Sequence, residues 1–322
     1  MSDVNVGQRE AAAWEAYHGS KPEDNIHDDY WLMNRLSKGK AFVGFNGGKK
    51  IIGAIEYALN PNVEWISDYQ TVSTDRPDTF DEYEWEWKQI GGTVPISSQE
   101  EAENQGGSRK FNLKSAKLQN LSDTVKSTLN TSFYSDGTGS SSKEAGGLRH
   151  IVASSPTTGS PGGINRATYS FWRNQQVSGA QTAADYDNLR SSMRSSYNSC
   201  SQGVSSQHPT FGVTTQTVFQ GYEGLLIANE RFTSKESGDG GFKNEVLKFK
   251  GLLLAWDRDC PSGLMYLLNE QFLKLAYLEG YWMKGYPAVE PANQFITVFK
   301  TETKCNLFSP QPRRLGVITA IT

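Results

Sequence analysis

The strongest constraint on the fold is a pair of strand patterns with a long polar stretch between them. KKIIGAIEYAL (49–59) is typical of a strand, and further along Tyr83, Trp85 and Trp87 alternate strictly with glutamates. The residues between them, roughly 60–80, are rich in Asp, Thr and Ser. This predicts an extended hairpin over 49–97. Because isolated two-stranded hairpins are only marginally stable in water, we expect it to lie on another surface.

A long helix is predicted directly after the hairpin, over residues 98–134. The segment opens on SSQEEAE, which offers a serine cap and acidic side chains for the first turn. Apolar residues then recur at spacings of three and four: Leu118, Leu121, Val125, Leu129 and Phe133. Gly106 and Gly107 favour a break near the start. The loop SDGTGSSSKEAGG ends the helix.

The other segments mix helices and strands. Helical spacing or a cap predicts three more helices, over 24–40, 182–200 and 215–229. Strand patterns are expected at the front of 148–180, in 246–256 and 262–283, and on both sides of the turn SPQPRR near the end. A hairpin, a long helix, a mixed middle part and closing strands together indicate the α+β class.

Charge and composition limit the partners of this chain. A protein that holds DNA through many phosphates carries a basic excess, but the formal net charge here is −3. DNA is therefore expected to be at most a loosely held neighbour. The three cysteines are scattered singly, which favours a reducing cytoplasm as the place of synthesis. The first residues have no apolar core and no stretch is long and apolar, so neither a signal peptide nor a membrane span is predicted.

Residues that could carry chemistry are present, but not in a recognised arrangement. FVGFNGGKK (42–50) lacks the spacing of a phosphate-binding loop and fits a turn before a strand. DRDC (257–260) matches neither a catalytic nor a calcium loop. Isolated candidates for a metal site or a thiol mechanism are interpreted as core or surface side chains: His18, His27, Asp28, Asp29, His150, His208, Cys200 and Cys260. We predict no enzyme activity, no catalytic or metal site and no cofactor.

Several short motifs occur in a fixed order within residues 129–174. They are DGTG (136–139), GL (147–148), GGINR (162–166) and YSFWR (169–173). This order resembles that of major capsid proteins of tailed bacteriophages with the Hong Kong 97-type fold, and the closing RRLGVITAIT is similar to the family's last strand. The resemblance covers most of the chain and is strongest at 82–174 and 294–322.

The resemblance implies a Hong Kong 97-like capsid fold in five parts. They are an N-terminal arm (1–48), an E-loop hairpin (49–97), a peripheral domain with a spine helix (98–174), an axial domain (175–290) and C-terminal strands of the peripheral domain (291–322). An axial domain lies near the centre of a hexamer or pentamer, and a peripheral domain away from it.

The same resemblance implies a function and partners. The subunit would self-assemble into hexamers and pentamers of an icosahedral head that encloses double-stranded DNA, which it contacts non-specifically. A separate scaffolding protein, a portal protein at one vertex and, in some heads, a decoration protein would be its other partners. It would be made in the host bacterial cytoplasm and end in the virion. An encapsulin-like shell around cargo enzymes is the alternative.

Two features of some family members are not expected here. Only about 48 residues precede the hairpin, too few for an internal scaffold, so no large maturation cleavage is predicted. Residues 58–81 contain no lysine, while Lys49, Lys50 and Lys88 sit at the stem. We therefore predict no covalent lysine–asparagine links between subunits.

Opposite charges on the hairpin and the helix predict how neighbours meet. Residues 56–86 carry nine acids and one base, whereas 109–126 carries five bases and one acid. Our hypothesis is that this match sets the register between subunits, together with burial of hairpin tryptophans; the alternatives are two solvated faces, or lysines that face DNA. The candidate interface residues are Trp65, Asp68, Asp75, Asp78, Asp81, Trp85, Trp87, Arg109, Lys110, Lys114 and Lys117.

Overall fold

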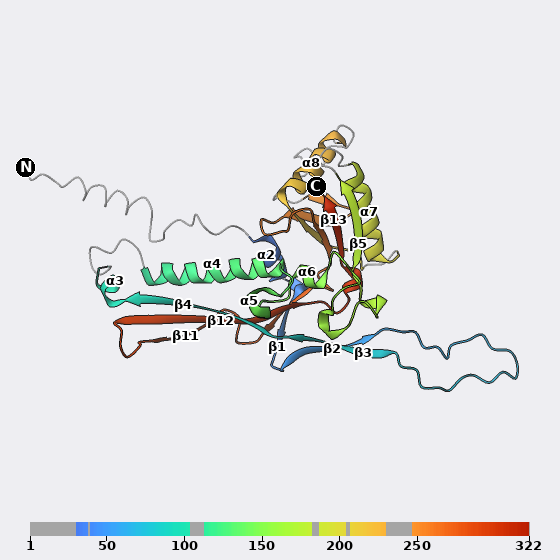
Figure 1. Ribbon diagram of the computed structural model, residues 1–322, viewed down its shortest axis with the longest axis horizontal. Coiled ribbons are helices and arrows are strands. Elements are labelled where there is room, and N and C mark those ends of the chain that lie inside the picture. The colour runs from blue at the N-terminus through green and yellow to red at the C-terminus, as the bar shows by residue number, and fades with distance from the viewer. Residues whose placement is uncertain are drawn as a thin grey trace, which may run out of the picture.

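The computed structural model describes residues 30–37, 39–103, 113–181, 187–203, 207–229 and 247–321. The molecule is elongated (Figure 1). A long helix and long strands extend to one side, and the loop between β2 and β3 reaches out on the opposite side. A second sheet with helices α7 and α8 rises above the middle.

A five-stranded sheet forms the long side of the molecule. Its central strand β12 (Ile296–Phe308) pairs antiparallel with β4 (Lys88–Ser97), β10 (Lys274–Leu278) and β11 (Lys284–Val289). The remaining strand, β1 (Phe42–Phe45), runs parallel to β10. The sheet therefore contains both parallel and antiparallel strand pairs, as is common in α+β folds.

Helix α4 (Leu113–Phe133) packs along β4, and its buried residues Leu121, Val125, Leu129 and Phe133 confirm the predicted spacing. Gly92 permits this close approach, because a Cβ there would lie 2.5 Å from Leu121 Cδ1. The start of the predicted helix forms the separate short helix α3 (Ser98–Glu103). The two glycines expected to break it, Gly106 and Gly107, lie outside the described residues.

The predicted hairpin exists, but it is shorter than 49–97. Strand β2 (Lys50–Glu56) pairs antiparallel with β3 (Phe80–Glu86). The predicted alternation is confirmed in β3, where Tyr83 and Trp85 are buried and the glutamates are exposed. The second strand pattern divides at Trp87, after which β4 leaves the hairpin and pairs with β12. Residues 88–97 therefore belong to the five-stranded sheet.

A six-stranded sheet forms the upper part, in the order β5, β13, β9, β6, β8, β7. The bounds are β5 (Gln175–Gln181), β6 (Phe211–Thr214), β7 (Leu247–Phe249), β8 (Leu252–Trp256), β9 (Met265–Leu268) and β13 (Gly316–Ile321). Successive residues of β9 face two different cores: Tyr266 contributes to the main core, and Met265 to a second one. Helices α7 (Asp187–Ser201) and α8 (Gln216–Asn229), both predicted, cover the second core.

The strand expected at the front of 148–180 is wrong, because a short helix, α6 (Leu148–Ile151), stands there. Gly147 places this segment against the end of α4: a Cβ on it would lie 2.4 Å from the Ser132 carbonyl oxygen. Leu148 and Ile151 are both buried, and a spacing of three fits a helical turn. Another short helical segment, α5 (Gly139–Ser142), precedes it in the loop that follows α4.

Residues 30–48 are part of the body of the fold and not of a free arm. Helix α2 (Trp31–Leu36) buries Leu32, Met33 and Leu36 in the main core, and β1 pairs with β10. The part of the predicted arm and helix before residue 30 lies outside the described residues.

The two predicted closing strands form but join different sheets. The short helical turn Pro312–Arg314 separates them, β12 lies in the five-stranded sheet, and β13 lies between β5 and β9 in the six-stranded sheet. Residues 291–322 therefore do not make one unit.

Candidate functional site

The loop 57–79 between β2 and β3 carries the most exposed large apolar side chains of the described chain. Trp65 and Tyr69 are fully exposed, at 101% and 107% of their accessible area. Further exposed apolar residues on it are Leu59, Val63, Ile66 and Val72. The loop has no core of its own, and its two limbs are joined by hydrogen bonds such as that from Asn62 Nδ2 to the Asp75 carbonyl, 2.6 Å. Large exposed apolar groups so close together mark a surface for another molecule.

The two other tryptophans proposed for the interface are placed differently. Trp85 is 4% exposed and its ring meets that of His150 edge-on, at 5.9 Å between centroids. Trp87 is half-buried; its Nε1 donates to the Gly48 carbonyl at 3.0 Å. Trp85 is therefore a core residue that holds the hairpin to its own subunit, and it presents almost no surface for the neighbour contact predicted from the sequence.

The motif residues of 162–173 form a structural clamp beneath the hairpin. Gly162 has a φ of +65°, and a Cβ there would lie 3.0 Å from Trp85 Nε1, so both conformation and space favour glycine. Trp172 Nε1 donates to the Pro161 carbonyl at 2.7 Å, and Arg173 Nε to the Arg166 carbonyl at 2.7 Å. These residues fix the base from which the loop 57–79 extends.

Arg166 is a fully buried cation at the centre of this clamp. Its guanidinium donates to the carbonyls of His150 and Ile151. Burial lowers the pKa of Arg166 to about 10, so it remains charged at neutral pH. Burial, followed by the charge of Arg166, also lowers the pKa of His150. The guanidinium of Arg166 bonds only to carbonyl oxygens, and the imidazole of His150 beside it is neutral. The two side chains therefore pack together and do not form an acid–base pair.

The proposed basic side of the interface is partly satisfied within the subunit. Lys117 Nζ lies 2.9 Å from both carboxylate oxygens of Glu100, and this bond is the largest cause of a lowered Glu100 pKa. Lys114 Nζ lies 4.7 Å from the centroid of the Phe299 ring. Arg109 and Lys110 lie outside the described residues. The pairing of Lys117 with Glu100 weakens the hypothesis that the cations of the helix form ion pairs with the acidic hairpin of a neighbouring subunit.

The proposed acidic side of the interface is exposed in the single subunit. Asp68, Asp75, Asp78 and Asp81 are all exposed. Asp75 accepts a hydrogen bond from Ser73 at 3.2 Å, and Asp78 bonds to Tyr57, whose pKa is raised chiefly by desolvation and also by this carboxylate. Figure 1 shows the loop and helix α4 on opposite sides of the subunit, so any contact between them joins two copies.

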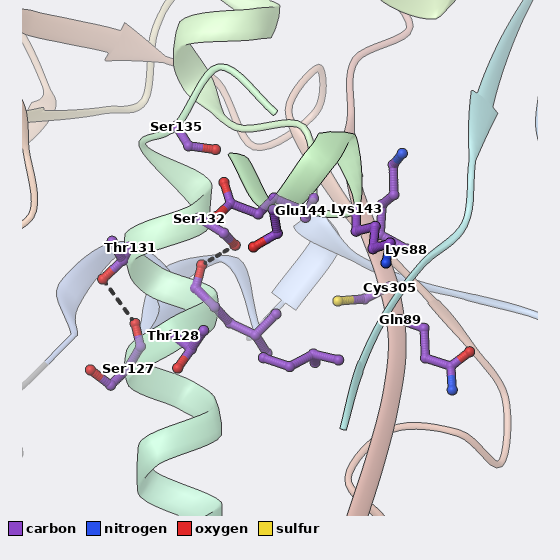
Figure 2. A pocket seen from close by; sticks show the side chains of 14 residues that line it. Lys88, Gln89, Ser127, Thr128, Thr131, Ser132, Ser135, Lys143, Glu144 and Cys305 are labelled. Carbon is purple, nitrogen blue, oxygen red and sulfur yellow. Dashed lines mark hydrogen bonds between the residues drawn. The ribbon is translucent and has the colours of Figure 1, made fainter. Parts of the chain in front are cut away.

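A groove lies between β4, the second half of α4 and the segment 140–145 (Figure 2). Its volume is about 440 Å³. Ile90, Leu129 and Cys305 contribute apolar surface. Charged groups are contributed by Lys88, Lys143 and Glu144, and Figure 2 shows the two lysines on the side opposite the helix.

The loop wall of this groove has an unusual backbone. Ser140, Ser141 and Ser142 have positive φ values of 48°, 58° and 63°. Such values are uncommon for residues other than glycine. Lys88 Nζ donates to the Ser142 carbonyl at 2.8 Å. We refer to this feature as the β4–α4 groove; the sequence did not predict it, because β4 and Cys305 of β12 are distant in the sequence from α4 and the segment 140–145.

Groups that could carry covalent or metal chemistry are not assembled in the part of the chain that the structure describes. All three cysteines are buried, and burial raises the pKa of the Cys200 and Cys305 thiols to about 12. No group of three or more His, Cys, Asp or Glu residues with metal-site geometry is found among the described residues. Within those same residues, no helix has the length and apolar character needed to cross a bilayer.

Comparison with known proteins places the fold. No family model matches the chain, and no curated protein does. The capsid of cyanophage A-1(L) is similar over 94% of this chain and 96% of its own, with a TM-score of 0.70 and 15% identity. The capsid of Myoviridae phage XM1 is similar over 95% and 96%, with a TM-score of 0.61 and 12% identity. The chain has the fold of these capsid proteins.

The capsid fold also occurs in a non-viral shell. The SrpI encapsulin of Synechococcus elongatus is similar over 100% of this chain and 96% of its own, with a TM-score of 0.61 and 13% identity.

Proposed function

We propose that this chain is the major capsid protein of a tailed bacteriophage, a structural subunit without enzymatic activity. Copies of it assemble into hexamers and pentamers of an icosahedral head that encloses double-stranded DNA. The observation that carries the proposal is the capsid fold together with a loop on which Trp65 and Tyr69 are fully exposed in the single subunit. A monomer gains nothing from exposing Trp65 and Tyr69, whereas a shell subunit needs contacts on every side.

In this reading the β2–β3 hairpin with its loop is the E-loop, and α4 is the spine helix. The peripheral domain consists of α4 and the five-stranded sheet. The axial domain consists of the six-stranded sheet with α7 and α8, and it includes β13, unlike the division expected from the sequence. Self-association into a virion head follows, with a separate scaffolding protein, a portal protein and, in some heads, a decoration protein as further partners.

We further propose that the loop 57–79 of one copy lies in the β4–α4 groove of the next. Loop and groove complement each other in part: the loop has four carboxylates and one arginine. The groove has Lys143 and Lys88 against Glu144, and Lys88 also lies 3.4 Å from Glu86 of its own subunit. The groove volume of about 440 Å³ is in the range of pockets that accept an aromatic anchor. Trp65 is the residue assigned to it, because buried tryptophans dominate the energetics of many interfaces.

Electron microscopy of the purified protein tests the function directly. Closed particles of uniform diameter are expected. Particles from infected cells should contain DNA that is protected from nuclease until the shell is opened. A protein that remains monomeric or forms only irregular aggregates with scaffolding protein present would overturn the proposal.

An encapsulin-like shell is the second candidate, and the similarity to the SrpI encapsulin supports it. Such a particle would assemble without scaffolding protein and would contain cargo enzymes in place of a genome. Mass spectrometry of the particle contents separates the two, since cargo protein without nucleic acid identifies the compartment. The motifs of 129–174 favour the phage head.

We expect mature particles to contain no covalent links between subunits. The loop has no lysine, and two of the three stem lysines are engaged: Lys50 Nζ lies 2.7 Å from a Glu84 carboxylate oxygen, and Lys88 bonds to Ser142. A denaturing gel of boiled particles should therefore show one band at the subunit mass. A ladder of oligomers that resists reductant would contradict this expectation.

A further inference from the structure

One surface of the six-stranded sheet region carries an unbalanced positive charge. The described segments that form it are 175–181, 187–203, 247–256 and 309–321. Together they contain six cations and one carboxylate, that of Asp187 at the start of α7. We call these cations the α7 patch: Arg190, Arg194, Lys248, Lys250, Arg313 and Arg314. Across the rest of the chain acids exceed bases, since the formal net charge of the whole is −3.

Three elements bring these residues to one surface. Helix α7 buries Leu189, Met193 and Cys200 against the sheet, which leaves Arg194 exposed on its outer side. The β7–β8 turn adjoins the helix, because Lys250 Nζ lies 3.5 Å from Asn198 Oδ1. Its ammonium also lies 5.3 Å from the centroid of the Tyr197 ring.

The end of helix α7 adds the other two cations. Arg314 Nη1 donates to the Ser201 carbonyl at 2.6 Å, and Arg313 donates to the Gln202 side chain. These bonds place the turn 312–314 against the last turn of α7. The Arg314 bond satisfies a carbonyl that the helix end leaves open, and neither bond neutralises a positive charge.

Carboxylate partners for Arg190, Arg194 and Lys248 are not found among the residues that the structure describes. Elsewhere in the chain the pattern differs, and cations such as Lys50 and Lys117 lie on acids. The acids of α7 and the neighbouring helix α8 are Asp187 and Glu223, two negative charges against six positive ones. Uncompensated cations on one surface of an acidic protein raise the local concentration of anions there.

We propose that the α7 patch binds the phosphate backbone of double-stranded DNA, without regard to sequence. Arg190 and Arg194 are one helical turn apart, with Cβ atoms about 5–6 Å from each other, so both can reach phosphates of one strand. The exposed Ser191 and Ser195 on the same helix are further donors to phosphate oxygens. The inference rests on the proposed function, which supplies the DNA, and it identifies the surface that faces it.

The patch also assigns an orientation to the subunit. The exposed acids of the hairpin repel DNA, whereas the α7 patch attracts it, so the patch faces the interior of the shell. A few phosphate contacts per subunit give weak, salt-sensitive binding, in agreement with the expectation that DNA is loosely held.

Binding of a labelled 30-base-pair duplex to the full-length, unassembled protein tests the inference. Affinity is measured by fluorescence anisotropy between 50 and 200 mM salt for wild type, for R190Q/R194Q and for a matched control, K40Q/K300Q, which removes two exposed lysines elsewhere. The R190Q/R194Q variant should bind about tenfold more weakly at 50 mM salt. Its slope of log K against log salt should be shallower by about 2, roughly 0.9 for each lost phosphate contact. The control should match wild type.

Two outcomes would overturn the inference. Wild type that does not bind the duplex, or an arginine variant with unchanged affinity and slope, excludes this surface as a DNA contact. Loss of particle assembly in R190Q/R194Q without any DNA binding by wild type would instead make α7 a contact between copies. Failure of the proposed function is recognised separately. Electron microscopy would then show no particles, whether or not the protein binds the DNA duplex.

Discussion

Replacing Trp65 by alanine is expected to abolish particle assembly while leaving the subunit folded. Trp65 is fully exposed in the single chain, so its loss removes no internal packing. If it anchors the loop in a neighbour's groove, the contact is made by every subunit of the shell. Truncation of a tryptophan anchor costs about 2 kcal/mol or more, which weakens each contact by roughly 30-fold. Particle yield in a sedimentation assay should fall below detection, with an unchanged melting temperature.

Two matched variants make this expectation sharp. W65F keeps an aromatic anchor and should restore particles in reduced yield. W85A changes the same residue type in the same hairpin, but Trp85 is buried, so the subunit itself should lose about 3–5 kcal/mol of unfolding free energy. Normal particle yield from W65A would refute the role assigned to the loop.

The groove itself can be blocked from the other side. Thr128 is an exposed residue of the β4–α4 groove, so T128F should fill it without disturbing the subunit core. We expect T128F to assemble as poorly as W65A. Normal assembly of T128F together with failure of W65A would mean that the loop contacts a neighbour elsewhere.

Local patterns in the sequence predicted the elements that pack on one face. The spacing of Leu121, Val125 and Leu129 marked the buried side of α4, and the alternation in β3 separated its core residues from its acids. Helices α7 and α8 were also predicted, α7 from a threonine cap at its start. Each of these signals is contained in a window of about 15 residues, where periodicity alone decides which side is buried.

What the sequence did not predict depends on contacts between distant segments. The pattern YEWEWKQIGG reads as one strand, but β3 packs on Gly162 and the next residues pair with β12, more than 200 positions away. Trp85 was expected at an interface between subunits. The alternation of aromatic and acidic residues shows that Trp85 and Tyr83 lie on the same side of the strand, but it does not show which part of the molecule covers that side. The β4–α4 groove was not predicted either, since no local sequence pattern indicates the positive φ values of Ser140, Ser141 and Ser142.

A buried polar network at the junction of the two sheets is the second place where a single change should have a large effect. Asp257, at the end of β8, is 4% exposed. It accepts hydrogen bonds from the Leu32 backbone N–H at 3.2 Å and from Asn130 Nδ2 at 3.1 Å. The Asp259 backbone N–H donates to it as well, at 3.1 Å. One carboxylate thus joins α2, α4 and the six-stranded sheet.

Burial raises the pKa of Asp257, and the hydrogen bonds donated to it oppose that shift. For holding α2, α4 and the six-stranded sheet together, the hydrogen-bond acceptor oxygens of Asp257 matter more than its negative charge. D257A leaves the donors of Leu32, Asn130 and Asp259 without this acceptor, and each unsatisfied buried group costs about 1–3 kcal/mol. We expect D257A to lower the unfolding free energy by about 3 kcal/mol or more. D257N retains one acceptor oxygen and turns an amide towards a donor, so it should lose about half as much.

Urea denaturation of the unassembled subunit, followed by tryptophan fluorescence, measures these losses at neutral pH. E290A provides the matched control, because Glu290 is an exposed acid of the five-stranded sheet region and its removal should change stability by no more than about 0.5 kcal/mol. The order of stability should be wild type and E290A, then D257N, then D257A. If D257A unfolds at the same urea concentration as E290A, the network does not hold the two sheets together, and the buried carboxylate has another role.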